Sequence, residues 1–272
     1  MRLEDEMLIV GSHAQGKLLA GAIDRIGVVL FNQPEKRNAV SLEMWDGVCS
    51  ALDRFAADDA IRVVVIAGSG GQAFSSGNDI SQFAERRASA EANAAYARTL
   101  ARGWASLAGT AKPTVACIEG YCVGGGLATA LLADVRVAAR ESVFGIPAAR
   151  LGIAYSFEAT ERLVSTVGPS RARLLLYTAR RLNGEEAHDI GLVDVLADDA
   201  ATECIAMAHT IASNAPLSVQ AAKFHVAQTL APADQRDHTR MQEITRRCMD
   251  SADYREGREA FMGKRPPVFT GM

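Results

Sequence analysis

Three consecutive glycines, Gly124-Gly125-Gly126, lie between an apolar segment and an alanine- and leucine-rich segment. The first segment, 113–117, predicts a strand, and the second predicts a helix that begins at the glycines. Because glycine has no Cβ, a backbone built from it can come very close to a ligand. A helix that begins there also points its unpaired N–H groups at that ligand. The triplet therefore predicts a site for an anionic oxygen.

The order of the other segments predicts an α/β fold, because strands and helices alternate before the pattern becomes mainly helical. The expected strands cover 18–24, 25–31, 61–67, 113–117, 134–138 and 192–195. The first expected helix follows Ser41, which is predicted as its N-cap. The other expected helices cover roughly 83–107, 157–167, 170–178, 184–189, 198–213, 216–228 and 234–262. Residues 1 to about 16 show no period and predict an extended or frayed arm. We expect an α/β core over 1–197 and a helical region over 198–272.

Composition excludes several classes of protein. A net charge of -3 and a pI near 6.0 leave no broad basic surface, which argues against a nucleic-acid partner. No apolar run approaches the length of a membrane span, and the first seven residues are too acidic for a signal peptide. We therefore expect a cytoplasmic protein with no membrane partner. The 5 cysteines form no CxxC pair and have no histidine at metal spacing, so we expect no metal site.

A second glycine-centred segment, 73–80, follows the strand at 61–67 and reads AFSSGNDI. Two such segments, each after a strand, are more specific than either alone. With PEKRNA at 34–39 and REGREAFMGKR at 255–265, they make the chain resemble the enoyl-CoA hydratase/isomerase (crotonase) family over nearly its whole length. The resemblance implies an α/β spiral of ββα units and a helical C-terminal region that assembles trimers, commonly stacked as a dimer of trimers.

The resemblance also implies an acyl-CoA substrate, with coenzyme A as part of that substrate and no permanently bound cofactor. The thioester oxygen would accept hydrogen bonds from the backbone N–H groups of Asn78 and Gly125, which would stabilise an enolate in an oxyanion hole. The residues implied to contact the adenine and pantetheine are Lys36, Arg37, Ser76, Asp79 and Ile80, completed by Phe261 and Lys264 from a neighbouring subunit. Taken singly, the basic residues among them could equally be solvated charges.

The chain departs from the family at two positions where its hydratases carry glutamates. Here the first position is Ala128, after the glycines, and the second is Ala148, after Phe144-Gly145-Ile146-Pro147. Two carboxylates can hold a water molecule and transfer its proton, but methyl groups cannot. We therefore do not expect the standard two-glutamate hydration.

The segment at 154–163 departs as well, because Tyr155, Phe157 and Glu158 stand where the family commonly has a glycine-rich loop. Glu158 is the leading candidate for a substitute acid or base, and Tyr155 is a candidate proton donor or substrate orienter. Glu158 could equally be a charge favoured by a helix N-terminus. We expect a lyase or isomerase of fatty acid metabolism. The alternatives are a non-catalytic acyl-CoA-binding protein and a CoA-ester decarboxylase or hydrolase.

Two residues beside the glycines are expected to have structural roles. Glu119 is expected to point away from the anionic-oxygen site and to make a structural hydrogen bond. Cys122 has no evident base to activate its thiol, so we expect it to be a packing residue.

Overall fold

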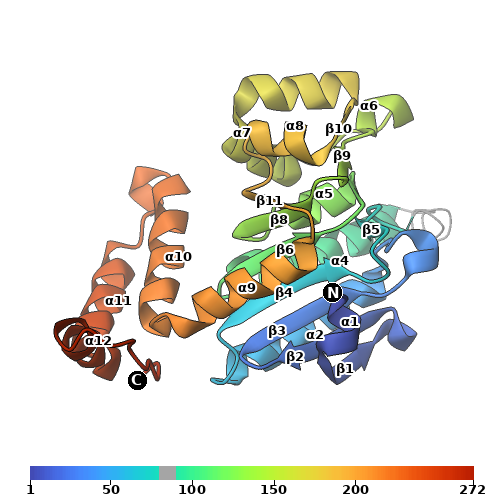
Figure 1. Ribbon diagram of the computed structural model, residues 1–272. Helices are drawn as coiled ribbons and strands as arrows, with labels where there is room; N and C mark the ends of the chain where they lie inside the picture. The colour runs from blue at the N-terminus through green and yellow to red at the C-terminus, as the bar shows by residue number, and fades with distance from the viewer. Residues whose placement is uncertain (80–89) are drawn as a thin grey trace.

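The computed structural model describes residues 1–79 and 90–272, which form two β-sheets and the helices around them (Figure 1). The strands are β1 (Leu8–His13), β2 (Leu18–Ile23), β3 (Ile26–Phe31), β4 (Val63–Gly68), β5 (Ala73–Ser75), β6 (Thr114–Ile118), β7 (Tyr121–Val123), β8 (Val135–Ala139), β9 (Val143–Gly145), β10 (Arg181–Leu182) and β11 (Val195–Ala197). The helices are α1 (Leu3–Glu6), α2 (Leu42–Ala57), α4 (Ala90–Gly109), α5 (Gly125–Ala130), α6 (Ala148–Leu151), α7 (Phe157–Thr178), α8 (Gly184–Asp189), α9 (Ala200–Ser213), α10 (Pro216–Leu230), α11 (His238–Asp250) and α12 (Ala252–Met262).

The larger sheet has the strand order β1-β2-β3-β4-β6-β8-β11, and the smaller sheet has the order β10-β9-β7-β5. The larger sheet is antiparallel from β1 to β3 and parallel from β3 to β11. Along the chain, a parallel strand of the larger sheet is followed by a strand of the smaller sheet and then by a helix, as in β6-β7-α5 and β8-β9-α6. This order confirms the predicted ββα units. The described part of the predicted helix at 83–107 is α4.

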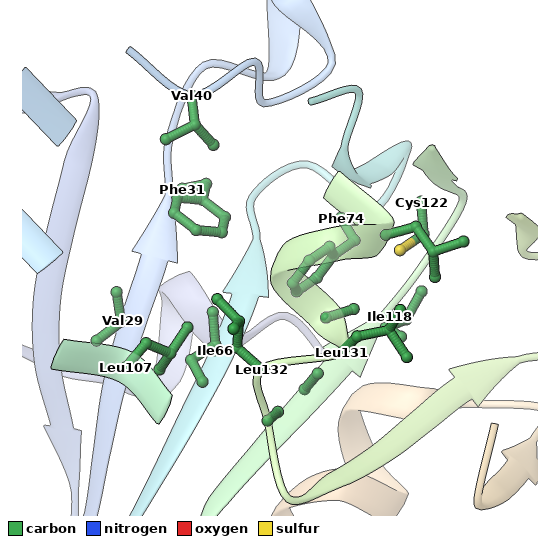
Figure 2. Packing of buried hydrophobic residues seen from close by; sticks show 14 of the residues in the cluster. Val29, Phe31, Val40, Ile66, Phe74, Leu107, Ile118, Cys122, Leu131 and Leu132 are labelled. Carbon is green, nitrogen blue, oxygen red and sulfur yellow. The ribbon is translucent and has the colours of Figure 1, made fainter. Parts of the chain in front are cut away.

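The two faces of the larger sheet are covered by different helices. In β3, Val28 and Leu30 pack on one side in a cluster that includes α9, whereas Val29 and Phe31 pack on the other side with α2, α4 and α5. Strand side chains alternate between faces, so both faces of this strand are buried. Figure 2 shows the second cluster, in which the Phe31 and Phe74 rings meet edge to face, 5.9 Å between centroids. This contact joins β3 of the larger sheet to β5 of the smaller one.

The predicted arm at residues 1 to 16 is wrong. Residues 3–6 form α1, and β1 pairs antiparallel with β2. Leu3 and Met7 are buried in the cluster that includes α9, while Leu8 and Ile9 of the edge strand are exposed. Because the apolar side chains of an edge strand need not alternate between core and solvent, this segment has no period by which the sequence would predict a strand.

The predicted single helix over 234–262 is also wrong, because α11 ends and α12 begins at Ser251. The Ser251 side chain accepts a hydrogen bond from the backbone N–H of Tyr254 at 3.0 Å, which caps α12. The helices predicted at 157–167 and 170–178 form one element, α7, with a break at Gly168. The last predicted strand is displaced, since 192–195 was expected and β11 covers Val195–Ala197.

The helices after α9 form an arm beside the sheets, coloured orange to red in Figure 1. Lys223 of α10 holds this arm to the core, because its ammonium pairs with Asp134 at 2.8 Å. By contrast α9, with which the predicted helical region 198–272 begins, packs on the larger sheet. The division at 197 and 198 and the trimeric assembly stay predictions. Within the described residues, no helix combines the length and apolarity that a membrane crossing requires.

Candidate functional site

The two glycine-centred segments meet at the start of α5. A Cβ placed on Gly77 would lie 3.0 Å from the backbone nitrogen of Gly125. A Cβ placed on Gly125 would lie 3.2 Å from the backbone nitrogen of Asn78. The structure therefore brings together the two residues predicted as donors, although they lie 47 positions apart in the sequence.

The N–H groups of Asn78 and Gly125 are both unpaired. Across residues 1–79 and 90–272, neither donates a hydrogen bond to the protein. The groups around them are paired: Val40 N–H donates to Gly77 O at 2.8 Å, and Gly124 N–H donates to Gly145 O at 2.8 Å. Two unpaired donors held side by side by paired neighbours can stabilise a single anionic oxygen.

Close approach of two backbones explains why this region is rich in glycine. A Cβ on Gly126 would lie 2.1 Å from the carbonyl oxygen of Ser75, and one on Gly120 would lie 2.0 Å from the carbonyl oxygen of Gln72. No side chain fits at either distance. Gly120 and Gly124 also have φ of 62° and 57°, a conformation that favours glycine. The glycines are thus required for the two segments to meet.

Four of the predicted coenzyme A contacts also lie together. Lys36 Nζ pairs with Asp79 Oδ2 at 3.0 Å, and the Asp79 side chain is only 8% exposed. Ser76 N–H donates to Arg37 O at 2.8 Å, and Ser76 Oγ donates to Lys36 O at 3.2 Å. These contacts join the 3₁₀ turn that ends at Lys36 to the segment after β5. The remaining residue of this group, Ile80, lies outside the described residues.

The sequence reasoning missed two residues beside this group. The guanidinium of Arg37 lies 4.7 Å from the centroid of the Tyr121 ring, and that of Arg181 lies 5.9 Å from it. Cations at these distances are attracted to the ring face. Tyr121 could have been noticed because it precedes the glycine triplet, but nothing local in the sequence marks Arg181, which comes from β10.

The two residues predicted to act from a neighbouring subunit lie on the arm. Phe261, near the end of α12, is 85% exposed, and Lys264 follows it with φ of 51°. An exposed aromatic ring of this size is available to a second protein surface. Its role toward coenzyme A stays a prediction.

Four positions within residues 1–79 and 90–272 bear on proton transfer near the two donors. Ala128 and Ala148 are buried and carry no titratable group. The Tyr155 hydroxyl donates a hydrogen bond to Gly124 O at 3.3 Å, and burial raises the pKa of this phenol. Glu158 lies in the first turn of α7, is exposed, and makes no hydrogen bond or ion pair within the described residues.

Glu119 and Cys122 have shifted pKa values and are close to the glycines in the sequence, but neither supplies one of the two donors. Burial raises the pKa of Glu119, and the charges of Asp199 and Glu4 raise it further. The predicted structural hydrogen bond of Glu119 is wrong for the part of the chain that the structure describes, since its carboxylate has no such partner there. Burial also raises the pKa of the Cys122 thiol, which is fully buried and therefore neutral. Cys122 is a packing residue, as predicted.

No group of three histidine, cysteine or acidic side chains in residues 1–79 and 90–272 could hold a metal ion.

The chain is similar to known proteins over most of its length. Residues 22–272 match the model of the family described as enoyl-CoA hydratase/isomerase. The chain is 32% identical over 257 residues to the 2,3-dehydroadipyl-CoA hydratase of Escherichia coli, with 94% of this chain and 99% of that protein covered. It is 35% identical over 249 residues to a putative enoyl-CoA hydratase of Thermus thermophilus, with 90% and 97% covered.

The fold is also similar to solved structures. A crystal structure of an enoyl-CoA hydratase/carnithine racemase from Magnetospirillum magneticum superposes with a TM-score of 0.90 at 32% identity. The match covers 97% of this chain and 99% of that one. The α/β fold implied by the sequence resemblance is therefore confirmed.

Proposed function

Because the chain belongs to the enoyl-CoA hydratase/isomerase family, we propose that it is an enzyme that stabilises the enolate of an acyl-CoA thioester. The observation that carries this proposal is the pair of unpaired N–H groups on Asn78 and Gly125, held side by side by glycine contacts. In the proposed reaction a base removes the α-proton, and the electron pair of the C–H bond is delocalised onto the thioester oxygen. The two N–H groups stabilise the charge that develops there.

The residues around Lys36 are proposed to bind the coenzyme A portion. The ammonium of Lys36 and the guanidinium of Arg37 are exposed and suit phosphate groups, while Ser76 holds the backbone that carries them and Asp79 pairs with the Lys36 ammonium. Ile80 belongs to this proposed group by its place in the sequence. In an assembly of three or six copies, Phe261 and Lys264 of a second subunit complete the nucleotide end. Coenzyme A enters and leaves as part of the substrate, and no permanent cofactor is proposed.

Glu158 is proposed as the acid or base. Its segment lies beside the oxygen donors, because the hydroxyl of Tyr155, three residues earlier, reaches the carbonyl of Gly124. Its carboxylate is exposed and has no hydrogen-bond or ion-pair partner within the described residues, so it is available to a substrate proton. The buried methyl groups of Ala128 and Ala148 argue against hydration by two glutamates, and the alanine at position 148 also argues against an isomerase that uses the second glutamate. Lyase or isomerase chemistry in this chain therefore needs another group, for which Glu158 is proposed.

Exchange of the α-protons of butyryl-CoA in D₂O, followed by NMR, tests this proposal, because enolate formation alone is enough to produce it. We expect exchange with the wild-type protein and a rate slower by roughly 10²-fold in Glu158→Gln. Glu161→Gln, an exposed residue of the same helix, serves as the matched control and should exchange at the wild-type rate. Equal rates for Glu158→Gln and the wild type would show that another group removes the proton.

The same two alanines support a second candidate function, binding of CoA esters without proton transfer. It predicts calorimetric binding of butyryl-CoA with no exchange and no turnover of any CoA ester in a wide panel. Decarboxylation or hydrolysis of a CoA ester on the same two donors is a third candidate. Release of CO₂ or of free coenzyme A distinguishes these two reactions from isomerisation.

A further inference from the structure

The hydrogen bond of Tyr155 ends on the peptide group that supplies one of the oxygen donors. The Tyr155 hydroxyl donates to the carbonyl oxygen of Gly124 at 3.3 Å, and this carbonyl shares its peptide group with the N–H of Gly125. We propose that Tyr155 is a positioning residue, which holds and polarises the peptide whose N–H binds the thioester oxygen. This inference rests on the proposed function, because it assumes that Gly125 N–H is such a donor.

Polarisation follows from the arrangement of hydrogen bonds on this peptide. Its carbonyl oxygen accepts from two groups, the Tyr155 hydroxyl and the N–H of Ala128 at 3.1 Å. Its N–H donates to no described residue. A hydrogen bond to the carbonyl end of a peptide increases the positive charge on its hydrogen, so successive bonds strengthen one another. Tyr155 therefore makes Gly125 N–H a better donor without touching the substrate.

The orientation of the peptide also needs support, because it follows a glycine. Gly124 has φ of 57° and ψ of -119°, and a Cβ placed on it would meet no atom nearer than 3.8 Å. No neighbouring side chain packs tightly against this glycine in the Cβ direction, so the hydrogen bonds of its N–H and carbonyl are the contacts that fix it. The N–H of Gly124 is held by Gly145 O on one side, and the Tyr155 and Ala128 bonds hold its carbonyl on the other.

Tyr155 is suited to this task because its phenol is fixed and neutral. The side chain packs against the hydrophobic cluster that includes Cys122 and Leu163. It is followed directly by Ser156, whose side chain caps α7 by accepting from Ala159 N–H at 3.2 Å. Burial raises the pKa of the phenol, and the adjacent Cys122 thiol is also neutral, so the O–H is a donor at neutral pH.

The burial of the Tyr155 phenol and its hydrogen bond to a backbone carbonyl favour a positioning role over proton transfer. A proton donor must pass through its charged form, and burial disfavours a phenolate here. The O–H of Tyr155 also points at a backbone carbonyl, which has no proton to return. Its two possible roles therefore predict different results when the hydroxyl is removed.

The experiment compares the wild type, Tyr155→Phe and the control Tyr177→Phe, an exposed residue of α7. Infrared difference spectra of bound butyryl-CoA carrying ¹³C at its carbonyl report the strength of the hydrogen bonds to the thioester oxygen. We expect the wild type and Tyr177→Phe to shift this band to lower frequency, and Tyr155→Phe to lose part of the shift. The α-proton exchange rate of Tyr155→Phe should fall about threefold to tenfold, with the Kd of butyryl-CoA unchanged.

Each other outcome overturns the inference in a recognisable way. A full band shift in Tyr155→Phe, whether exchange is abolished or unaltered, excludes a positioning role, and abolished exchange would identify Tyr155 as a proton donor. No band shift in the wild type refutes the proposed function itself. If Tyr155→Phe does not fold, 3-fluorotyrosine at position 155 replaces it, because its O–H is a stronger donor and must then increase the band shift.

Discussion

The candidate site has two halves that are built from different kinds of group. The donor half consists of the backbone N–H groups of Asn78 and Gly125, and it is fixed by backbones packed so closely that a Cβ on Gly126 would lie 2.1 Å from Ser75 O. The proton-transfer half consists of side chains: Ala128 and Ala148, where family hydratases are expected to have glutamates, and the segment from Tyr155 to Glu158. A backbone donor cannot be lost by substitution without disturbing the packing around it, whereas a carboxylate can be replaced by a methyl group at little structural cost. The fold therefore preserves the first half and leaves the second free to change.

The largest effect is expected from breaking the donor half with Gly126→Ala. The new Cβ would lie 2.1 Å from Ser75 O, so α5 must move away from the segment after β5. This displacement separates the two donors, and we expect α-proton exchange of butyryl-CoA to fall by at least about 100-fold, the usual cost of losing an oxyanion donor. Exchange rates measured by NMR, with circular dichroism to verify the fold, give the result.

Gly109→Ala is the matched control, because a Cβ on this last residue of α4 would meet nothing within 4 Å. It should retain the wild-type rate. If Gly126→Ala is folded and exchanges as fast as Gly109→Ala, the close contact of the two segments is not what positions the donors.

The difference between the halves also explains which features the sequence predicts. The meeting of Gly77 with Gly125 could be predicted because each lies in a short segment with a recognisable pattern after a strand. The bond from Tyr155 to Gly124 could not, because it depends on how the start of α7 packs against β7 and α5. The same holds for Arg181, which reaches Tyr121 from a strand paired in the smaller sheet. Local patterns predict backbone sites, and tertiary packing decides side-chain contacts.

The secondary structure likewise divides into elements that local patterns predict and elements that depend on tertiary packing. Ser41 was predicted as a helix cap, and it accepts a hydrogen bond from Met44 N–H at the start of α2. The edge strand β1 was missed, because its apolar residues Leu8 and Ile9 face solvent. The cap involves residues that are close in the sequence, so a local pattern predicts it. The exposure of β1 depends on elements distant in the sequence, which a local pattern cannot report.

The next largest effect is expected from supplying the missing groups of the proton-transfer half. If the donor half is intact, Ala128→Glu combined with Ala148→Glu should hydrate crotonyl-CoA at least about tenfold faster than either single variant, because holding a water molecule needs both carboxylates. Both positions are buried, so a carboxylate at either one lowers stability, but position 148 begins α6, where a negative charge is favourable. Loss of the crotonyl-CoA absorbance measures the rate.

The matched control carries glutamine at both positions, which has the same shape but transfers no proton. Its hydration rate should equal that of the wild type. Hydration by the wild type at a rate typical of enzymes would refute the argument from Ala128 and Ala148, because these positions would then be dispensable.

The smallest effect concerns a carboxylate outside both halves. Glu119 lies just before the glycines, and burial, followed by the charges of Asp199 and Glu4, raises its pKa above that of the unfolded chain. The folded state therefore binds a proton at Glu119 more tightly than the unfolded state does. Ionised Glu119 destabilises the fold above its folded pKa, and this cost fades as the pH falls through that pKa and is absent below the unfolded pKa of about 4.3.

Glu119→Gln should consequently raise Tm by about 1–2 °C at pH 7, a difference that shrinks toward zero near pH 4, while the exchange rate stays at the wild-type value. Glu243→Gln is the control, because this carboxylate of α11 is exposed and its charge is not among those that raise the pKa of Glu119. Thermal unfolding at pH 7 and near pH 4 measures the Tm difference between each variant and the wild type. A Tm gain that is the same at both pH values would mean that the substituted amide packs better for reasons unrelated to charge. A slower exchange rate would instead place Glu119 in the proton-transfer half, since a shifted pKa beside a site does not by itself make a carboxylate part of that site.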